Sequence, residues 1–585
     1  MEIEELVTMS PAKPTQASQT VAQQIAESLK RHGVEYIIGQ SIPSSVTLAA
    51  VEVGIKQVLA RTEKDGAIMA DGYARATNRI PVVTSCSGPG TALLACGLGE
   101  ALYASVPMVA LVQDIPDAYT DRNAAQEFDD LAMLKTVTKH ARRVTRPDRI
   151  VDYIDRAFMI AATGRPGPVA LLLAPELFGE KAVVPEFPRT GSYGRFPLDR
   201  SLPAPEAIAA AADLIKAAAR PVIIAGGGVY LSQARAEVQA LSEAAGIPVG
   251  TTTMGRGAVP DEYPLALGAM TYAIGNRSMG KHQRPLMEEA DLVILIGTRT
   301  NQNGTHSWKL YPKQAKFIHI DIDPNEIGRT YEAVRLVGDA KVTLQALTAA
   351  VRQRQSADAK ARASSAAARI EKARAAYRSE IRSAVESSKT PVRPERVISA
   401  LDKLAPAGTI MVGDASYATT WITNYVAARA DRYRFITPRG QAGIGWGFPM
   451  ALGVKLAEPD RMTVYLGGDG AFGYTWSELE TAVRQGVKSF VAIVLNNSVF
   501  GYQKDAEDVA LGEHTTRLHI APVDHCAIAK ACGWHAIRVE RPDQVESALR
   551  EALQGTQPVL VEVISDPSAY PPLITFDNRL PDLVE

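Results

Sequence analysis

Short apolar runs alternate with longer amphipathic segments in three separate stretches of the chain. In the first stretch, residues 20–179, positions 21–32 have the polar and apolar pattern of a helix, and β-rich runs occur at 81–84 and 108–112. A regular alternation of helix and strand predicts a parallel sheet that is covered by helices.

The second and third stretches repeat this alternation. We therefore expect an α/β fold class, with three consecutive doubly wound domains whose sheets are mostly parallel. The β-rich runs are at 221–225, 292–296 and 317–322 in the second stretch, and at 409–412, 463–466, 490–495 and 559–564 in the third.

The composition changes between these stretches. Residues 350–389 are rich in Ala, Arg, Lys, Glu and Gln and have few large apolar side chains, which is typical of a solvated helical connector. We expect a flexible tail at 1–18, a first domain at 19–185 and a central domain at 203–350. The connector should occupy 351–390, followed by a third domain at 391–570 and a C-terminal tail or lid at 571–585.

Composition narrows the class of protein further. The chain has 585 residues, 46% of them hydrophobic and 22% charged, with a formal net charge of −1. Such a balance is ordinary for a globular protein and argues against nucleic acid or an anionic membrane as a partner. No uninterrupted apolar run is long enough to span a membrane. Four cysteines without metal-ligand spacing fit a reducing cytoplasm.

The segment 461–500 carries the most informative chemistry. It has the pattern of a strand, a glycine turn, an amphipathic helix and a second strand, with Asp469 after the first strand and Asn497 after the second. Because a right-handed crossover makes the two strands parallel, both side chains should emerge at one carboxyl edge. Open α/β sheets bind their ligands at that edge.

The hexapeptide GDGAFG, residues 468–473, also matches the GxGxxG pattern of dinucleotide-binding proteins. A carboxylate inside that loop would repel a pyrophosphate, and Asn496 and Asn497 stand where the ribose-binding acid is expected. A carboxylate beside a diphosphate is favourable when a cation lies between them. The segment therefore favours a metal-bridged diphosphate over a nicotinamide or flavin.

Magnesium prefers six oxygen ligands, usually one or two protein groups together with phosphates and water. We predict that Asp469, the Asn497 amide and the backbone carbonyl of Val499 hold Mg²⁺. Glycines at 468, 470 and 473 would permit a tight turn and close backbone approach. Either motif alone would indicate an ordinary turn, but the two together favour a cofactor site.

The GDG motif, followed by 25 residues and NN, resembles the signature of thiamine diphosphate enzymes. The peptide TEKDGAIMADGYAR, residues 62–75, resembles the acidic-helix motif in the pyrimidine-binding domain of acetolactate synthases, pyruvate oxidases and 2-oxo acid decarboxylases. SGPG at 87–90 resembles the glycine loop of that domain, and GRPGPV at 164–169 and HIDID at 319–323 extend the resemblance. It implies pyrimidine-binding, central Rossmann-like and diphosphate-binding domains, in that order.

The resemblance also implies roles for individual residues. Glu63 matches the glutamate that donates a hydrogen bond to the aminopyrimidine ring and favours a tautomer able to remove the reactive proton. Gln126 matches a pocket glutamine of the acetolactate synthase branch, and Ile444 matches the aliphatic residue that bends the cofactor into a V. Without the resemblance, Glu63 would be interpreted as a helix cap and Ile444 as core packing.

The remaining cofactor contacts come from the same matched loops. Ser87–Gly90 and Gly413–Ala418 resemble loops that hold the pyrimidine end and the diphosphate end, respectively. We expect contacts with thiamine diphosphate from Gly88, Pro89, Ala415, Ser416, Tyr417, Ala442, Ile444, Gly468, Asp469, Gly470, Ala471, Asn497, Val499, Phe500, Gly501 and Tyr502.

In this family one subunit binds the pyrimidine ring and its partner holds the diphosphate. The resemblance therefore implies a homodimer or homotetramer with active sites between subunits. It also implies a lyase or carboligase that acts on a small-molecule substrate, a 2-oxo acid or related carbonyl compound. A 2-hydroxyacyl-CoA lyase, a flavin-linked 2-oxo acid oxidase and a non-catalytic regulatory homologue are the alternatives.

Departures from the family pattern concern the substrate and the central domain. Acetolactate synthases usually have a Met and a Trp after the NN motif, where this chain has Tyr502, Gln503 and Ala506. An ordinary role in branched-chain amino acid synthesis is therefore disfavoured. Relatives bind FAD, ADP or nothing in the central domain, and the glycines at 226–228 fit either phosphate approach or an ordinary turn.

Overall fold

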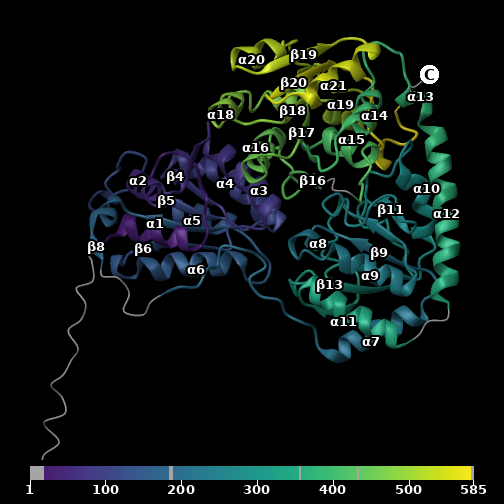
Figure 1. Ribbon diagram of the computed structural model, residues 1–585, viewed down its shortest axis with the longest axis horizontal. Coiled ribbons are helices and arrows are strands. Elements are labelled where there is room, and N and C mark those ends of the chain that lie inside the picture. Colours follow the sequence, from purple (N-terminus) through teal and green to yellow (C-terminus); the bar gives the residue numbers. More distant parts are fainter. Residues whose placement is uncertain (1–18, 183–188, 355–357, 431–433, 581–585) are drawn as a thin grey trace, which may run out of the picture.

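The computed structural model describes residues 19–182, 189–354, 358–430 and 434–580 and contains three parallel six-stranded sheets (Figure 1). This arrangement confirms the predicted α/β fold of three doubly wound domains. The strands begin and end within two residues of the predicted runs. The predicted N-terminal tail, residues 1–18, lies outside the described residues.

The first domain has the strand order β3-β2-β4-β5-β7-β6, with a short β1–β8 ribbon beside it. Helix α1 begins with a capping box at Thr20 and buries Val21, Ile25 and Leu29 against the sheet. The elements are β1 (Gln19–Thr20), α1 (Val21–Arg31), β2 (Tyr36–Gly39), α2 (Ser44–Glu52), β3 (Lys56–Leu59), α3 (Glu63–Thr77), β4 (Val82–Cys86), α4 (Pro89–Ala104), β5 (Val109–Gln113), α5 (Asp130–Val137), β6 (His140–Val144), α6 (Ile150–Ala162), β7 (Val169–Leu173) and β8 (Lys181–Ala182).

The central domain has the strand order β11-β10-β9-β12-β13-β14. Counted within the domain, this is the order 3-2-1-4-5-6 of a Rossmann-like sheet, with the topological switch point between β9 and β12. The elements are α7 (Pro205–Ala217), β9 (Pro221–Ala225), α8 (Gly228–Leu231), α9 (Arg235–Ala245), β10 (Val249–Thr251), β11 (Ala266–Ala269), α10 (Met279–Glu288), β12 (Leu292–Ile296), β13 (Lys316–Asp321), β14 (Val334–Val337) and α11 (Ala340–Gln353).

A long helix, α12 (Ala359–Glu380), occupies the stretch in which the composition predicts a connector. It runs along one edge of the molecule between the central and third domains, and α13 (Arg382–Val385) follows it (Figure 1). Only Ala366, Ile370 and Tyr377 of α12 are buried, so most of its surface faces solvent.

The third domain has the strand order β16-β15-β17-β18-β20-β19. Its two central strands, β17 and β18, are paired in parallel with Gly468 opposite Leu495, so the loops that follow them lie at the same edge. The elements are α14 (Pro394–Leu404), β15 (Ile410–Gly413), α15 (Tyr417–Tyr425), β16 (Arg434–Ile436), α16 (Gly447–Ala457), β17 (Thr463–Gly468), α17 (Asp469–Phe472), α18 (Glu478–Arg484), β18 (Phe490–Asn496), α19 (Gly501–Leu511), α20 (His525–Ala531), β19 (His535–Val539), α21 (Val545–Gln554) and β20 (Val559–Ile564).

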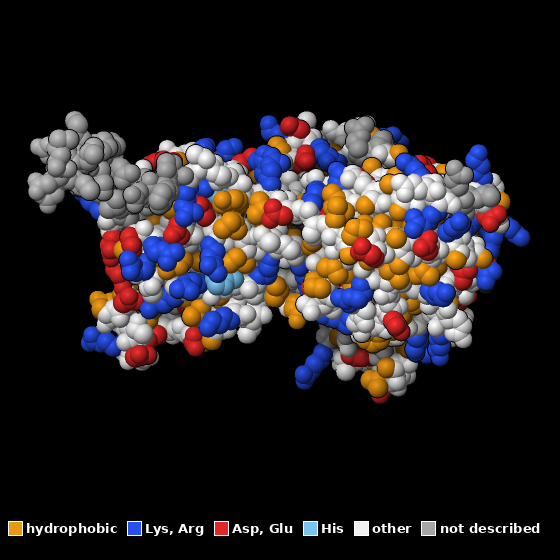
Figure 2. Space-filling view, turned by 90° about the horizontal axis from the view of Figure 1, so that it is seen from below, with side chains coloured by type: hydrophobic (Ala, Val, Ile, Leu, Met, Phe, Trp, Pro, Cys, Tyr) orange, Lys and Arg blue, Asp and Glu red, His pale blue; other side chains and the backbone are white. Residues whose placement is uncertain are grey.

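The surface reflects the balanced composition. On the face in Figure 2, Lys and Arg side chains are interspersed with Asp and Glu side chains. None of the helices in the described part of the chain has both the length and the apolar character needed to cross a membrane.

Helices α3 and α16 join the first domain to the third through a close crossing. A β-carbon on Gly72 would overlap the carbonyl oxygen of Met450, and one on Gly453 would overlap that of Met69. The two glycines therefore allow the helix backbones to touch. This contact fixes the first domain against the diphosphate-binding domain.

We predict that Gly453→Ala weakens this crossing, because the new methyl group must push two helix backbones apart. Overpacking of this kind costs about 1–3 kcal/mol, which should lower the Tm by roughly 3–10 °C in a thermal unfolding scan. Gly179→Ala is the matched control, since a β-carbon there meets nothing within 4 Å. Equal Tm values for the two variants would contradict the role of the crossing.

A second contact between the same domains is a pair of buried acids. Asp65 and Glu478 are 1% and 0% exposed, and the N–H of Arg61 donates to Glu478 Oε1 at 2.7 Å. Burial, followed by the charge of Asp65, raises the pKa of Glu478 to about 7. Burial also raises the pKa of Asp65. The contact is therefore most stable while the pair holds a proton.

This pair predicts a pH-dependent stability. Because the pKa of Glu478 is raised on folding from its ordinary 4.5, its stabilising contribution is complete below about pH 4.5 and is lost as the pH rises through about 7. Glu478→Gln, which stays neutral, should reduce the fall in the free energy of unfolding between pH 5 and 8 by an amount on the order of 2 kcal/mol, measured by denaturant unfolding at each pH. The exposed Glu546→Gln is the control, and an unchanged pH profile in Glu478→Gln would refute the prediction.

Candidate functional site

A cavity of about 380 Å³ lies at the carboxyl edge of the third-domain sheet. The loops after β15, β16, β17 and β18 form most of its wall. Fourteen of the residues predicted to contact the cofactor line it: Ala415, Ser416, Tyr417, Ala442, Ile444, Gly468, Asp469, Gly470, Ala471, Asn497, Val499, Phe500, Gly501 and Tyr502.

Asp469 and Asn497 lie next to each other in this wall. Asp469 is 3% exposed, and its Oδ2 accepts the N–H of Ser498 at 2.9 Å. Burial raises the pKa of Asp469 to about 6, and no Lys or Arg in the described part of the chain forms an ion pair with it. A cation in the cavity would therefore compensate a carboxylate that is otherwise unpaired.

The two adjacent asparagines have different surroundings. Asn496 turns inward and donates to Glu562 Oε1 at 2.7 Å, whereas Asn497 lines the cavity. The Asn497 Oδ1 accepts the N–H of Val499 at 3.2 Å, and the Val499 carbonyl accepts the N–H of Gly501 at 2.9 Å. These oxygens each keep a lone pair, so the donor set fits an oxygen-preferring divalent cation.

Space, rather than a left-handed backbone, requires glycine in the GDG loop. Gly468 and Gly473 have φ values of −86° and −55°, which other residues also adopt. Gly470 is required for space, because a β-carbon there would lie 2.8 Å from the Phe500 ring. The close approach of this backbone to a diphosphate stays a prediction.

Two buried carboxylates hold the loop that carries Ile444. Glu100, from helix α4 of the first domain, accepts the N–H groups of Gly440, Gln441 and Ala442 at 2.7, 2.6 and 3.2 Å. Asp414 accepts those of Gly445 and Gly447 at 2.9 and 3.2 Å. Both acids are 0% exposed, and burial raises the pKa of Asp414 to about 6.

This loop is under backbone strain. Ala442 has a φ of 62°, in the left-handed region, which costs a residue with a β-carbon about 1–2 kcal/mol. Such strain persists where the surrounding contacts determine the backbone. Sequence reasoning missed Glu100, which belongs to no recognisable motif. It gave no role to Asp414, although this residue lies in the matched loop Gly413–Ala418.

The predicted residues of the first domain form a separate group. Glu63 is the first residue of α3, is 8% exposed, and its Oε1 lies beside Gly90. The carbonyl of Gln126 accepts the hydroxyl of Ser87 at 2.9 Å and lies against Gly88.

Glu63, Gly88, Pro89 and Gln126 are thus brought together, but none of them lines the third-domain cavity. Within one chain the two groups are separate, and their meeting around one ligand between subunits stays a prediction.

Several cavity residues escaped the sequence analysis. Tyr272 and Asn303 come from loops of the central domain, and Arg439 follows β16. All three residues follow the carboxyl ends of strands, where open α/β sheets bind ligands, so the sequence pattern could have identified them. The other residues that sequence reasoning missed are Pro394, Ala418, Trp421, Leu495, Gln503, Ser565, Asp566 and Ala569.

The described part of the C-terminal segment packs beside the same cavity. Leu573 and Phe576 are 1% exposed, and the Phe576 ring lies 6.4 Å from the ring of Tyr417 and 6.0 Å from that of Tyr502. The segment through Leu580 is therefore packed, and the last five residues lie outside the described chain.

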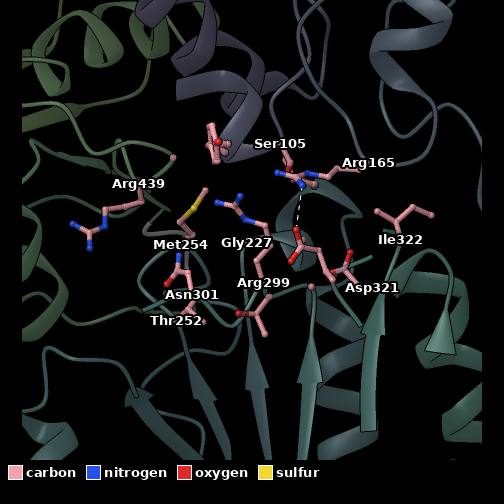
Figure 3. Close-up of a pocket in the computed structure, with 18 of the residues that line it drawn as sticks. Ser105, Arg165, Gly227, Thr252, Met254, Arg299, Asn301, Asp321, Ile322 and Arg439 are labelled. Atoms are coloured by element: carbon pink, nitrogen blue, oxygen red, sulfur yellow. Dashed lines mark hydrogen bonds and ion pairs between the residues drawn. The ribbon is translucent and has the colours of Figure 1, made fainter. Parts of the chain in front are cut away.

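A second cavity, of about 330 Å³, lies at the switch point of the central sheet (Figure 3). Gly227, Arg299 and Asp321 line it, and burial raises the pKa of Asp321 to about 7. Gly226 and Gly228 pack against Gly297, so close packing explains two of the three adjacent glycines. The two cavities share Tyr272, Asn303, Arg439 and Ala442 as a common wall.

Three family models match consecutive parts of the chain. They describe the thiamine pyrophosphate enzyme N-terminal TPP binding domain over residues 19–133, the central domain over 208–347 and the C-terminal TPP binding domain over 414–563. Each match falls within one of the three domains, although the first ends before β6 and the third begins just after β15.

Similar proteins cover almost the whole chain. A probable acetolactate synthase large subunit of Methanocaldococcus jannaschii is 31% identical over 96% of this chain and 95% of its own length. A probable acetolactate synthase large subunit of Methanococcus aeolicus is 32% identical over 90% of this chain and 88% of its own. The acetolactate synthase large subunit of Haemophilus influenzae is 29% identical over 94% of this chain and 95% of its own. The chain therefore belongs to the thiamine pyrophosphate enzyme family, in its acetolactate synthase-like group, and is a thiamine diphosphate-dependent enzyme that forms carbon-carbon bonds.

Proposed function

We propose that this enzyme is a lyase or carboligase that uses thiamine diphosphate and Mg²⁺ to transfer the acyl part of a 2-oxo acid. The observation that carries the proposal is the cavity in which Asp469, Asn497 and Ile444 meet at one sheet edge. An oxygen donor set faces a loop that two buried carboxylates hold rigid. This arrangement suits a metal-bound diphosphate with a reactive ring above it.

Asp469, Asn497 and the Val499 carbonyl would hold the metal, and the loops at Ala415–Tyr417 and Gly468–Ala471 would enclose the diphosphate. The bound cofactor supplies the nucleophilic carbon and stores the electron pair of the broken bond. Ile444 would set the angle between the two cofactor rings. Glu63 would form a hydrogen bond with the pyrimidine nitrogen, in a site that largely excludes water.

The separation of the two groups supports assembly from two copies as a homodimer or homotetramer. Glu63, Gly88, Pro89 and Gln126 of one copy would complete the cavity of the other. Leu93, on α4, is 44% exposed, and Phe128, close to Gln126 in sequence, is 52% exposed. Apolar side chains of this size on a surface favour coverage by a partner.

The flavin-linked oxidase is the second candidate, because the central cavity adjoins the cofactor cavity. Gly227 and the Arg299 cation would suit the phosphates of FAD or ADP at the switch point. A yellow protein with a bound flavin would support this candidate.

Cleavage of a 2-hydroxyacyl-CoA remains a prediction from the sequence. The family assignment argues against a non-catalytic homologue. All four cysteines are unpaired, which supports a cytoplasmic location.

Asp469→Ala should lose cofactor binding, because it removes the charged ligand of the metal. We expect the affinity for thiamine diphosphate in the presence of Mg²⁺, measured by titration calorimetry, to fall about 100-fold or more. The exposed Asp460→Ala on the same domain is the control and should bind normally. Retention of wild-type affinity by Asp469→Ala would refute the metal assignment.

Glu63→Gln should bind the cofactor normally and activate it slowly, because an amide cannot share a proton in the same way. NMR of the bound cofactor in D₂O should show exchange of the reactive proton slowed by about 10²- to 10⁴-fold. The exposed Glu52→Gln serves as the control. Exchange at the wild-type rate in Glu63→Gln would exclude the proposed role.

A further inference from the structure

Among the described residues that line the cofactor cavity, Arg439 is the only Lys, Arg or His. The two other charged residues in that lining are Asp469, which the metal would neutralise, and Asp566, which pairs with Arg393. A substrate that enters this cavity therefore meets one positive side chain.

The guanidinium of Arg439 is held in place. It stacks over the ring of Tyr272 at 5.5 Å and donates to the Tyr272 hydroxyl at 3.2 Å. Tyr272 is itself fixed, because its N–H donates to the Asn303 carbonyl and its carbonyl accepts the N–H of Ile574. The backbone next to Arg439 is fixed by the hydrogen bond that the N–H of Gly440 donates to Glu100.

Arg439 forms no ion pair with any Asp or Glu in the described part of the chain. Its side chain is half-buried and points away from Arg299 and Asp321 of the central cavity (Figure 3). A guanidinium has five donors in a planar fork that matches a carboxylate. Here one donor is used on a neutral hydroxyl, so the rest are available to an anionic ligand.

The chemistry of a carboligase indicates which carboxylate this cation should bind. Two 2-oxo acids and one proton give one 2-hydroxy-3-oxo acid and one CO₂. The donor breaks its bond to the carboxylate and loses that charge, so a cation bound there would stabilise the ground state more than the transition state. The acceptor keeps its carboxylate while a new carbon-carbon bond forms at its carbonyl carbon and the carbonyl oxygen gains the proton.

We propose that Arg439, oriented by Tyr272, binds the carboxylate of the acceptor, so that the enzyme selects a second 2-oxo acid over an uncharged aldehyde. This inference rests on the proposed carboligase function. It assigns Arg439 as a specificity-determining residue and Tyr272 as the residue that positions it.

The test uses full-length enzyme with Mg²⁺ and thiamine diphosphate, pyruvate as donor, and 2-oxobutyrate and propanal as competing acceptors. Arg439→Gln should lower the ratio of the acidic to the neutral ligation product by about 10- to 100-fold. It should raise the KM for 2-oxobutyrate by a similar factor and leave the KM for propanal within about twofold. Tyr272→Phe should lower the ratio by about 2- to 10-fold. Arg541→Gln, an exposed arginine of the same domain, is the control.

A binding measurement supports this kinetic test. Titration of the loaded enzyme with oxamate, an unreactive 2-oxo acid analogue, should give an affinity at least about tenfold weaker in Arg439→Gln than in the wild type.

An unchanged product ratio in Arg439→Gln would overturn the inference and leave the proposed function intact. The inference would also be overturned if Arg439→Gln lowered the ligation rates with both acceptors equally. It would be overturned likewise if the variant lost only the binding of FAD or ADP. Absence of CO₂ release by the wild-type enzyme from any 2-oxo acid would overturn the proposed function and the inference together.

Discussion

The site depends on the hydrogen bonds that the loop at residues 440–447 donates to two buried carboxylates. Glu100 fixes its first half from the first domain, and Asp414 fixes its second half from within the third domain. An acid buried at 0% exposure is stable only when its oxygens are satisfied, so the loop and the two acids determine one another. Ile444 lies between the two anchors and Arg439 directly precedes them. The glycine-mediated crossing of α3 and α16 is a precondition, because it docks the domain that supplies Glu100.

Sequence alone was sufficient for the features that depend on local pattern. Buried parallel strands such as 221–225 and 559–564 are largely continuous apolar runs, so the residues at which they begin and end can be predicted from the sequence. The placement of Asp469 and Asn497 at one edge follows from the handedness of the crossover between β17 and β18. Features that depend on tertiary contact could not be predicted. Glu100 and Gly440 are 340 residues apart, and Tyr272 reaches the cavity from another domain. The need for glycine at 470 has the same origin, since it comes from the tertiary contact with the ring of Phe500.

Within a single chain the predicted cofactor residues form two separate groups. The third domain contains the oxygen donors Asp469 and Asn497 and the loop at 440–447. The first domain contains the buried Glu63 beside the glycine loop. The central domain contributes Tyr272 and Asn303 to the wall between two cavities, which places any ligand of its own next to the reaction. This division explains why each domain has its own sheet and edge while the chemistry requires all three.

The central claim is that Glu63 of one copy acts on the cofactor held by Asp469 of another. Co-expression of Glu63→Ala and Asp469→Ala chains with different tags, followed by tandem purification, isolates the mixed assembly. A mixed dimer has one site with both substitutions and one site with neither, so we predict about half of the wild-type turnover per dimer, although each variant alone is inactive. A mixed assembly as inactive as its parents would contradict the account, because it would mean that both residues serve the site of their own chain.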